Sequence, residues 1–356
     1  MANRLLVDAT NSFAARRTGF CRQTAGGLSG SRENDTISPM KKQSVLLAAG
    51  LWFAGRVLVC GAAVSPRVAA LPEAAWEQSE WISVADAKVA SPADQKAQRA
   101  ADGTAVFWRR AVNSREIRSV TWMTAGLGVY ELYVNGVRVG EDFLKPGFTH
   151  VRKTRRSFTY DVTALVNRAA GASNDFGVEV GAGWWRDKIV AYTGRKSAFR
   201  GVFEVVYADG TRAFVGTRAG EWNGSARSPV AHSGIFDGEE FDARVQSPAR
   251  TPAAFAAFAP GGCEANGEFK GAILPTGGAE ICLRRDLAME RGPYSLKKGE
   301  TLVVDFGQNC AAVPLFRFRA KAGTVLTALP GEMLNDADKG ARGCDGPKGS
   351  VYRANL

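Results

Sequence analysis

The chain has 356 residues and a net charge of +11, a length that suits roughly two to three domains. Residues 1–42 carry seven Lys/Arg and three Asp/Glu, so four surplus charges lie there and the other seven are scattered. Scattered charge does not form a continuous basic surface, and we expect no nucleic-acid partner. Two histidines and six cysteines without a C-x-x-C pair argue against a metal centre, so no metal site or cofactor is predicted.

The first 70 residues have the composition of a leader rather than of a domain. Residues 1–39 are polar and without periodicity, and we interpret them as a mis-called extension upstream of a true start at Met40. Two lysines followed by the apolar run 44–55 are typical of a signal peptide, which we place at 40–70, with cleavage at 61–63 or 68–70. The predicted protein is secreted or periplasmic and has no membrane contact after cleavage. A membrane-anchoring helix or a buried N-terminal helix is the alternative.

The globular part begins at Trp76 and consists of short apolar runs with turn residues between them. Such runs predict strands, at 81–82, 105–112, 119–124, 157–162 and 175–185, with a Pro-Gly turn at 143–148 and one helical turn at 162–166. Strands at this spacing predict a mainly β fold, specifically an antiparallel jelly-roll β-sandwich over residues 76–247.

Two hairpins carry the clearest local signals. In the stretch 126–140, Asn135-Gly136 separates two alternating apolar runs, and a type I′ turn needs positive φ at both central residues. The second hairpin is predicted at 202–215, with its turn at Asp209-Gly210.

The chain after residue 247 reads as a linker followed by a second β segment. Residues 248–272 are predicted to be the linker because Pro, Ala and Gly are frequent from Pro248 to Gly262. Over 273–356 we predict strands at 302–309, 315–319 and 324–328. No closing strand follows them, so we expect this second domain to be incomplete.

An acidic cluster is the first candidate for chemistry. Asp237, Glu239, Glu240 and Asp242 lie within six residues, and two carboxylates can cleave a glycosidic bond when about 5–5.5 or 6.5–9.5 Å apart. Residues two apart on one face of a strand lie about 7 Å apart. A solvated loop whose carboxylates cap turns or meet Arg244 explains the cluster as well, and we favour that interpretation.

A tryptophan pair is the second candidate. Trp184 and Trp185 follow Gly181-Ala-Gly183 at the end of a predicted strand. Sugars stack their apolar faces on aromatic rings while polar groups fix the hydroxyls, and Asn135 and Asp142 are possible polar partners. Strand alternation turns at least one of the two rings inward, so one of them is expected in the core.

The run Arg152-Lys-Thr-Arg-Arg156 is the one dense basic segment after the signal. With Phe158 and Tyr160 it could form a nucleic-acid surface. We favour the other interpretation, a solvated strand edge that charge protects from pairing with other chains.

Several of these landmarks together carry a family resemblance. Leu127–Gly140 and Leu144–Thr149, and after them Tyr160–Thr163, Gly181–Trp185 and Asp237–Arg244, resemble the N-terminal β-sandwich of bacterial α-L-rhamnosidases of glycoside hydrolase family 78. Asp305–Asn309, Ala322–Val325 and Gly331–Asp336 are similar to the next β domain of that family, which implies an incomplete concanavalin-like domain over 273–356.

The resemblance also implies a function for the full-length protein. Members hydrolyse terminal α-L-rhamnosides, but their catalytic motif around Asp-Cys-Pro-Gln-Arg lies in a helical domain that has no counterpart here, so no catalytic residue is transferred. The chain also has Ala312-Val-Pro314 where the family has Gly-Trp-Val. Related sandwiches bind rhamnose with calcium, yet no motif here identifies calcium ligands.

The resemblance therefore implies the N-terminal, non-catalytic part of an α-L-rhamnosidase. Its expected partners are a downstream catalytic domain and a rhamnose-containing glycan or glycoside. The alternatives are a stand-alone carbohydrate-binding module and a structural or adhesive β-sandwich. We expect no glycosidase activity from the chain as it stands. A carbohydrate-binding module predicts rhamnose affinity that is lost on replacing Trp184 or Trp185, and a structural or adhesive sandwich predicts no sugar binding.

Overall fold

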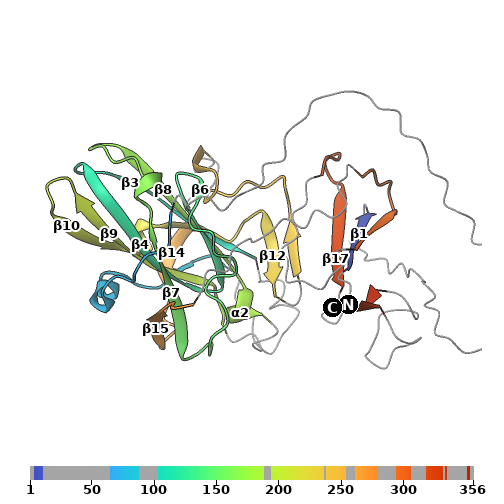
Figure 1. The fold of residues 1–356 in the computed structure, drawn as a ribbon, viewed down its shortest axis with the longest axis horizontal. Coiled ribbons are helices and arrows are strands. Elements are labelled where there is room, and N and C mark those ends of the chain that lie inside the picture. The colour runs from blue at the N-terminus through green and yellow to red at the C-terminus, as the bar shows by residue number, and fades with distance from the viewer. Residues whose placement is uncertain are drawn as a thin grey trace, which may run out of the picture. The chain divides into compact units, whose positions relative to one another are not determined.

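A computed structural model describes residues 4–10, 65–87, 103–187, 194–235, 238–253, 261–278, 294–305, 318–331, 333–334 and 351–352. The chain divides into two units, one of them Cys60–Arg284 and the other Met1–Val59 together with Arg285–Leu356. Strands dominate the described residues of both units (Figure 1). The predicted mainly β fold is confirmed.

The unit Cys60–Arg284 is built on a 12-stranded sheet. Its strand order is β15-β7-β4-β9-β2-β14-β11-β3-β8-β5-β6, with β10 paired to β9. The strands are β2 (Ile82–Val84), β3 (Ala105–Val112), β4 (Ile117–Leu127), β5 (Val129–Val134), β6 (Val137–Arg138), β7 (Thr154–Asp161), β8 (Ser173–Gly181), β9 (Ala198–Tyr207), β10 (Arg212–Gly216), β11 (Asn223–Ser225), β14 (Gly261–Ala265) and β15 (Ala272–Pro275).

Short helical turns and a separate hairpin complete the described part of this unit. The helical turns are η1 (Glu73–Gln78), η2 (Thr163–Leu165), α2 (Gly183–Arg186) and η4 (Ala219–Glu221). β12 (Val230–Gly234) and β13 (Gly238–Phe241) pair only with each other. The turn at η2 matches the single helical turn predicted at 162–166, whereas the tryptophan pair lies in α2 rather than at a strand end.

Both predicted hairpins are present. Asn135 and Gly136 join β5 to β6 with φ of 50° and 80°, the positive values that the turn requires. Gly210 also has positive φ, in the turn between β9 and β10.

Trp122 on β4 lies at the centre of the core and joins strands that are distant in the sheet order. Its ring stacks on Phe203 of β9 with 4.7 Å between centroids and meets Phe176 of β8 edge-on at 5.9 Å. Phe107 of β3 meets Phe199 of β9 at 6.3 Å. The sheet therefore curls until its two halves face each other. Burial of side chains this large stabilises by about 1.5–3 kcal/mol each, so the aromatic layer holds the two halves together.

The expectation of a purely antiparallel sandwich is wrong at one pair. β15 lies parallel to β7, with Leu274 opposite Arg156, while the other pairs among the described strands are antiparallel. β7 is thereby enclosed between β4 and β15, so the segment 154–156 does not lie on a sheet edge as predicted. No turn signal could reveal this, because a parallel partner comes from a distant part of the chain.

The predicted linker is partly a component of the sandwich. β14 pairs with β2 and β11 inside the main sheet. Ala249 is buried against the outer face of the sheet, where a Cβ on Gly177 would lie 2.4 Å from its carbonyl oxygen. The first domain thus extends beyond the predicted boundary at residue 247, and the segment 247–251 forms a strap across β8.

Residues 65–70 also contact the sandwich. Ser65 Oγ accepts a hydrogen bond from the Gly140 amide at 2.7 Å, and the Val68 amide donates to the Thr159 carbonyl at 2.9 Å. The remainder of the predicted signal segment, 40–64, lies outside the described residues. Among the residues that are described, no helix is both long and apolar enough to cross a membrane.

The second unit contains a three-stranded antiparallel sheet. β1 (Arg4–Thr10) lies between β16 (Thr301–Asp305) and β17 (Val325–Gly331), and β18 (Met333–Leu334) pairs with β19 (Val351–Tyr352). β17 matches the strand predicted at 324–328, and β16 covers the described part of the strand predicted at 302–309, of which 306–309 lie outside the described residues. No strand was predicted at 4–10. In the predicted strand 315–319, the part 315–317 lies outside the described residues and 318–319 is not in a strand.

Candidate functional site

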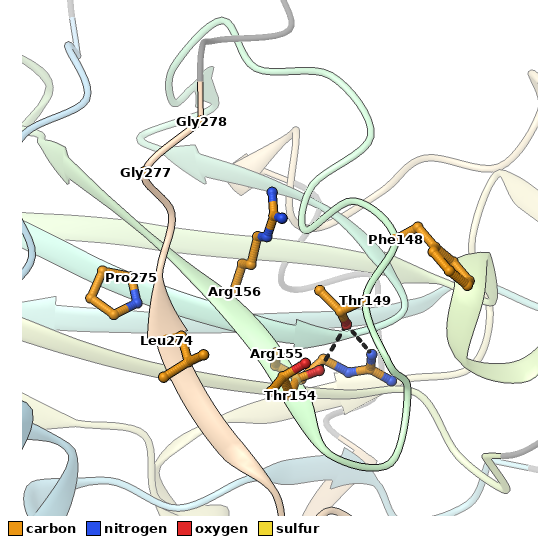
Figure 2. A pocket seen from close by; sticks show the side chains of 9 residues that line it. All are labelled: Phe148, Thr149, Thr154, Arg155, Arg156, Leu274, Pro275, Gly277 and Gly278. Carbon is orange, nitrogen blue, oxygen red and sulfur yellow. Dashed lines mark hydrogen bonds between the residues drawn. The ribbon is translucent and has the colours of Figure 1, made fainter.

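A surface pocket of about 510 Å³ lies where β7, β15 and the loop before β7 meet, a volume that suits a small ligand. Figure 2 shows its lining side chains around the parallel pair β7 and β15. The lining residues are Phe148, Thr149, Thr154, Arg155, Arg156, Leu274, Pro275, Gly277 and Gly278. None of them is acidic, so the pocket carries positive charge.

Arg155 is a buried cation in the wall of this pocket. Only 2% of the residue is exposed, and its guanidinium lies over the rings of Trp185 and Phe269 at 4.8 and 5.5 Å from their centroids. Nη1 donates to Thr149 Oγ1 at 3.1 Å, whereas Nε and Nη2 have no hydrogen-bond partner among the described residues. Burial lowers the pKa of Arg155 to about 10, so the group stays protonated at neutral pH.

Arg156 is the cation of the pocket that a ligand can contact. It is exposed, and because strand side chains alternate it leaves β7 on the face opposite Arg155. In Figure 2 its side chain extends toward Gly278 while that of Arg155 lies beside Thr149. The pocket therefore combines a fixed buried charge with a guanidinium fork that a ligand can contact.

An aromatic rim borders the pocket. Phe148 is 62% exposed and meets Trp184 edge-on with 6.4 Å between ring centroids. Trp185 is buried and donates from Nε1 to the Lys196 carbonyl at 2.9 Å. One tryptophan thus points inward, as predicted, and Trp184 is the one of the pair near the pocket.

The predicted polar partners of the tryptophans are engaged inside the fold. Asn135 donates from Nδ2 to the Leu165 carbonyl at 2.8 Å and to Asn174 Oδ1 at 3.0 Å. Its Oδ1 accepts from the Asp175 amide at 2.9 Å. These three hydrogen bonds fix the ends of β5 and β8. The side-chain amide of Asn135 therefore stabilises the hairpin.

Asp142 is connected to the pocket through one other residue. It is 2% exposed and accepts hydrogen bonds from the Tyr160 hydroxyl at 2.9 Å and from Arg67 Nη1 at 3.4 Å. Arg67 Nη2 donates in turn to the Gly278 carbonyl. Asp142 therefore orients the arginine that holds one wall of the pocket.

The acidic cluster lies on a different element, the β12–β13 hairpin. Glu239 and Glu240 are exposed on β13, and Asp237 lies outside the described residues. Asp242 follows β13 and pairs with Arg244 at 2.7 Å, and this hydrogen bond lowers the pKa of Asp242 to about 2. Neighbouring protein desolvates the Glu239 carboxyl and raises its pKa. Glu239, Glu240 and Asp242 do not line the pocket.

Phe148 was not predicted as a candidate site residue, and Arg155 was considered only as part of the basic run 152–156, for which a solvated strand edge was favoured. Phe148 had a usable signal, because it follows a Pro-Gly turn where a large apolar side chain is readily exposed. The burial of Arg155 depends on α2 and on Phe269, and no local pattern indicates it. Among the described residues no group of His, Cys, Asp and Glu could hold a metal ion.

Fold and site together define a β-sandwich domain with an aromatic-rimmed, basic pocket. Residues 115–257 match the family model described as the alpha-L-rhamnosidase N-terminal domain. Over these residues the chain is therefore similar to the α-L-rhamnosidase N-terminal domain family, as the sequence resemblance indicated.

Curated relatives agree with this assignment. The chain is 30% identical over 295 residues to an alpha-L-rhamnosidase of Streptomyces avermitilis, covering 81% of this chain and 26% of the relative. It is 26% identical over 253 residues to an alpha-L-rhamnosidase of Formosa agariphila, covering 68% of this chain and 25% of the relative. The chain thus spans about a quarter of the length of the relatives it matches.

A solved structure shares the fold. The alpha-L-rhamnosidase of Aspergillus terreus aligns with a TM-score of 0.54 at 24% identity, over 67% of this chain and 27% of that one. At this identity the likeness concerns the fold alone.

Proposed function

We propose that this chain is the N-terminal, non-catalytic part of an α-L-rhamnosidase, in which the sandwich supports a catalytic domain and contacts the glycan. The observation that carries the proposal is the match of residues 115–257 to the N-terminal domain of the family, within a chain that spans about a quarter of its relatives. On this proposal the sandwich is of the jelly-roll type, and β16 to β18 begin a second, concanavalin-like domain.

Glycan contact would use the rim of the pocket. Phe148 offers an exposed ring, and Trp184 packs against its edge. Aromatic faces stack on the apolar C–H faces of sugars, and a pocket of about 510 Å³ can take a mono- or disaccharide unit. Asn135 and Trp185 would act from within the fold, by fixing the hairpin and the floor of the pocket.

A second candidate function is hydrolysis at the acidic hairpin. It is favoured by the raised pKa of Glu239 close to the lowered pKa of Asp242, since glycosidases need one protonated and one ionised carboxyl. Against it stands the exposure of β13, whose residues are all open to solvent, because an acid–base pair works in an enclosed site.

The test is an assay of the purified chain on an aryl α-L-rhamnoside, with release of the aryl alcohol as readout. We expect no turnover above the uncatalysed rate. Turnover that disappears in Glu239→Gln, Glu240→Gln or Asp242→Asn would contradict the proposal and place catalysis on the hairpin.

The stand-alone binding module makes a separate prediction. Titration with L-rhamnose should show affinity that falls about three- to tenfold in Trp184→Ala and is unchanged in Phe214→Ala, a partly exposed aromatic on β10. Equal affinity in all three proteins removes the rim as the contact site. A sandwich that binds no sugar at all would be structural or adhesive.

The proposal includes secretion, with cleavage at 61–63 rather than 68–70. Support comes from Ser65 and Val68, whose hydrogen bonds to Gly140 and Thr159 would be lost if the chain began after Ala70. N-terminal sequencing of the exported protein should therefore give a start before Ser65.

A further inference from the structure

We propose that the pocket between β7 and β15 binds an oxyanion substituent on a saccharide, a carboxylate of an acidic sugar, with Arg156 as the contacting donor and Arg155 as a fixed charge in its wall. This inference rests on the proposed function and adds the chemical class of the ligand. The basic run 152–156, which was expected to be a solvated strand edge, thereby gains a specific role.

The state of Arg155 is the first support. A buried cation normally meets a carboxylate, because desolvation of an isolated charge is costly. Two other buried cations of this unit do so, since Lys145 lies 3.2 Å from Glu131 and Lys196 lies 2.7 Å from Glu264. Arg155 instead has two aromatic rings and one hydroxyl, and its Nε and Nη2 lack partners among the described residues. Its charge is therefore uncompensated within the described fold.

The composition of the pocket is the second support. Its lining contains two arginines and no acid, so the field inside it favours an anion. Arg156 presents a planar fork of N–H donors, which matches a carboxylate in a bidentate geometry. Arg155 is too deeply buried for direct contact, but a charge in a low-dielectric wall acts over a longer distance than an exposed one.

The neighbouring groups favour a saccharide as the carrier of the anion. Phe148 stands at the rim with 62% of the residue exposed, and Leu274 is 50% exposed beside Arg156. An apolar rim next to a cationic wall suits a ring that has one apolar face and one charged substituent. A long nucleic-acid strand would instead need an extended basic track.

The experiment titrates the purified chain with D-glucuronate, D-glucose 6-sulfate and methyl glucoside at low and high ionic strength, by calorimetry or by NMR. We expect glucuronate to bind at least tenfold tighter than methyl glucoside, with the difference shrinking as salt increases. The sulfate ester separates carboxylate recognition from general oxyanion recognition. Glucuronate that binds no tighter than methyl glucoside, or a single-stranded oligonucleotide that displaces it completely, overturns the inference.

The variants assign the effect to the two arginines. Arg156→Gln should lower glucuronate affinity about tenfold and leave methyl glucoside affinity unchanged, and Arg155→Met should lower glucuronate affinity severalfold. Arg212→Gln, an exposed arginine on β10, is the matched control and should change neither. If Arg156→Gln binds glucuronate as the wild type does, the inference is wrong. Equal binding of acidic and neutral sugars would refute it while leaving the proposed function intact, whereas rhamnoside turnover would refute the proposed function itself.

Discussion

Arg155 is a residue of the pocket wall whose burial costs stability. Its pKa is lowered to about 10, because burial opposes the charged form. Above about pH 10 the unfolded chain therefore binds more protons at this group than the folded chain does, so the contribution of Arg155 to stability improves as the pH rises through about 10. At neutral pH the full desolvation cost is present.

Removing the Arg155 charge should therefore not harm the fold. We expect Arg155→Met to leave the free energy of unfolding unchanged or to raise it by up to about 2 kcal/mol, measured by urea denaturation at neutral pH. The matched control is Lys196→Met, which removes a buried cation bound to Glu264 and to the Val84 and Ala85 carbonyls, and which should destabilise. A larger loss in Arg155→Met than in Lys196→Met would contradict this interpretation.

Asp242 supplies a pH-dependent prediction at the same scale. Its hydrogen bonds with Arg244 lower its pKa to about 2. The stabilisation from this lowered pKa is present above the unfolded value near 4 and is lost as the pH falls through about 2. In a carboxyl ¹³C titration the Asp242 midpoint should move up toward its ordinary value in Arg244→Gln. An unchanged midpoint would show that Arg244 does not hold the carboxylate.

At the scale of elements, the strap 247–251 makes a prediction with an unusual sign. Replacing a strand glycine with alanine usually stabilises by about 0.5–1 kcal/mol, but a Cβ on Gly177 would lie 2.4 Å from the Ala249 carbonyl oxygen. Gly177→Ala should therefore destabilise by about 1–3 kcal/mol. Gly220→Ala, where a Cβ meets nothing within 4 Å, is the control and should be neutral or stabilising. A Gly177→Ala protein as stable as the wild type would mean that the strap is not docked on β8.

Elements with local signals were the ones that sequence could predict. Asn135-Gly136 and Gly210 fix their turns through backbone conformation, so both hairpins are readable from neighbouring residues. β15 and β14 have no such signal, because their partners lie far away in the chain. The pocket depends on β15, so the same long-range pairing that hid the parallel strand also hid the site.

The candidate site likewise contains residues with a local sequence signal and residues whose role depends on long-range contacts. Trp184 was predicted as a candidate because a tryptophan beside glycines is a local pattern, although it lies in α2 and not at the predicted strand end. Asp142 was identified as polar and close to the hairpin, yet its connection to the pocket runs through Arg67, which lies 75 residues earlier in the chain. The lack of a carboxylate partner for Arg155 among the described residues depends on its surroundings, and only the folded chain shows it.

At the scale of the whole molecule, the proposed function is that the chain contacts glycan and does not cleave it. The family match covers residues 115–257, and the pocket lies at strands of that same sandwich unit. Glu239 and Glu240 lie on β13, Asp242 follows it directly, and none of the three lines this pocket. Binding and cleavage are thus separable in one experiment.

The most direct measurement is a saturation-transfer NMR time course of the purified chain with an α-L-rhamnoside. We expect transfer of saturation to the sugar protons, reduced in Trp184→Ala, with no free rhamnose signals appearing over time. Free rhamnose that accumulates with the wild type, or the absence of any saturation transfer, would contradict it.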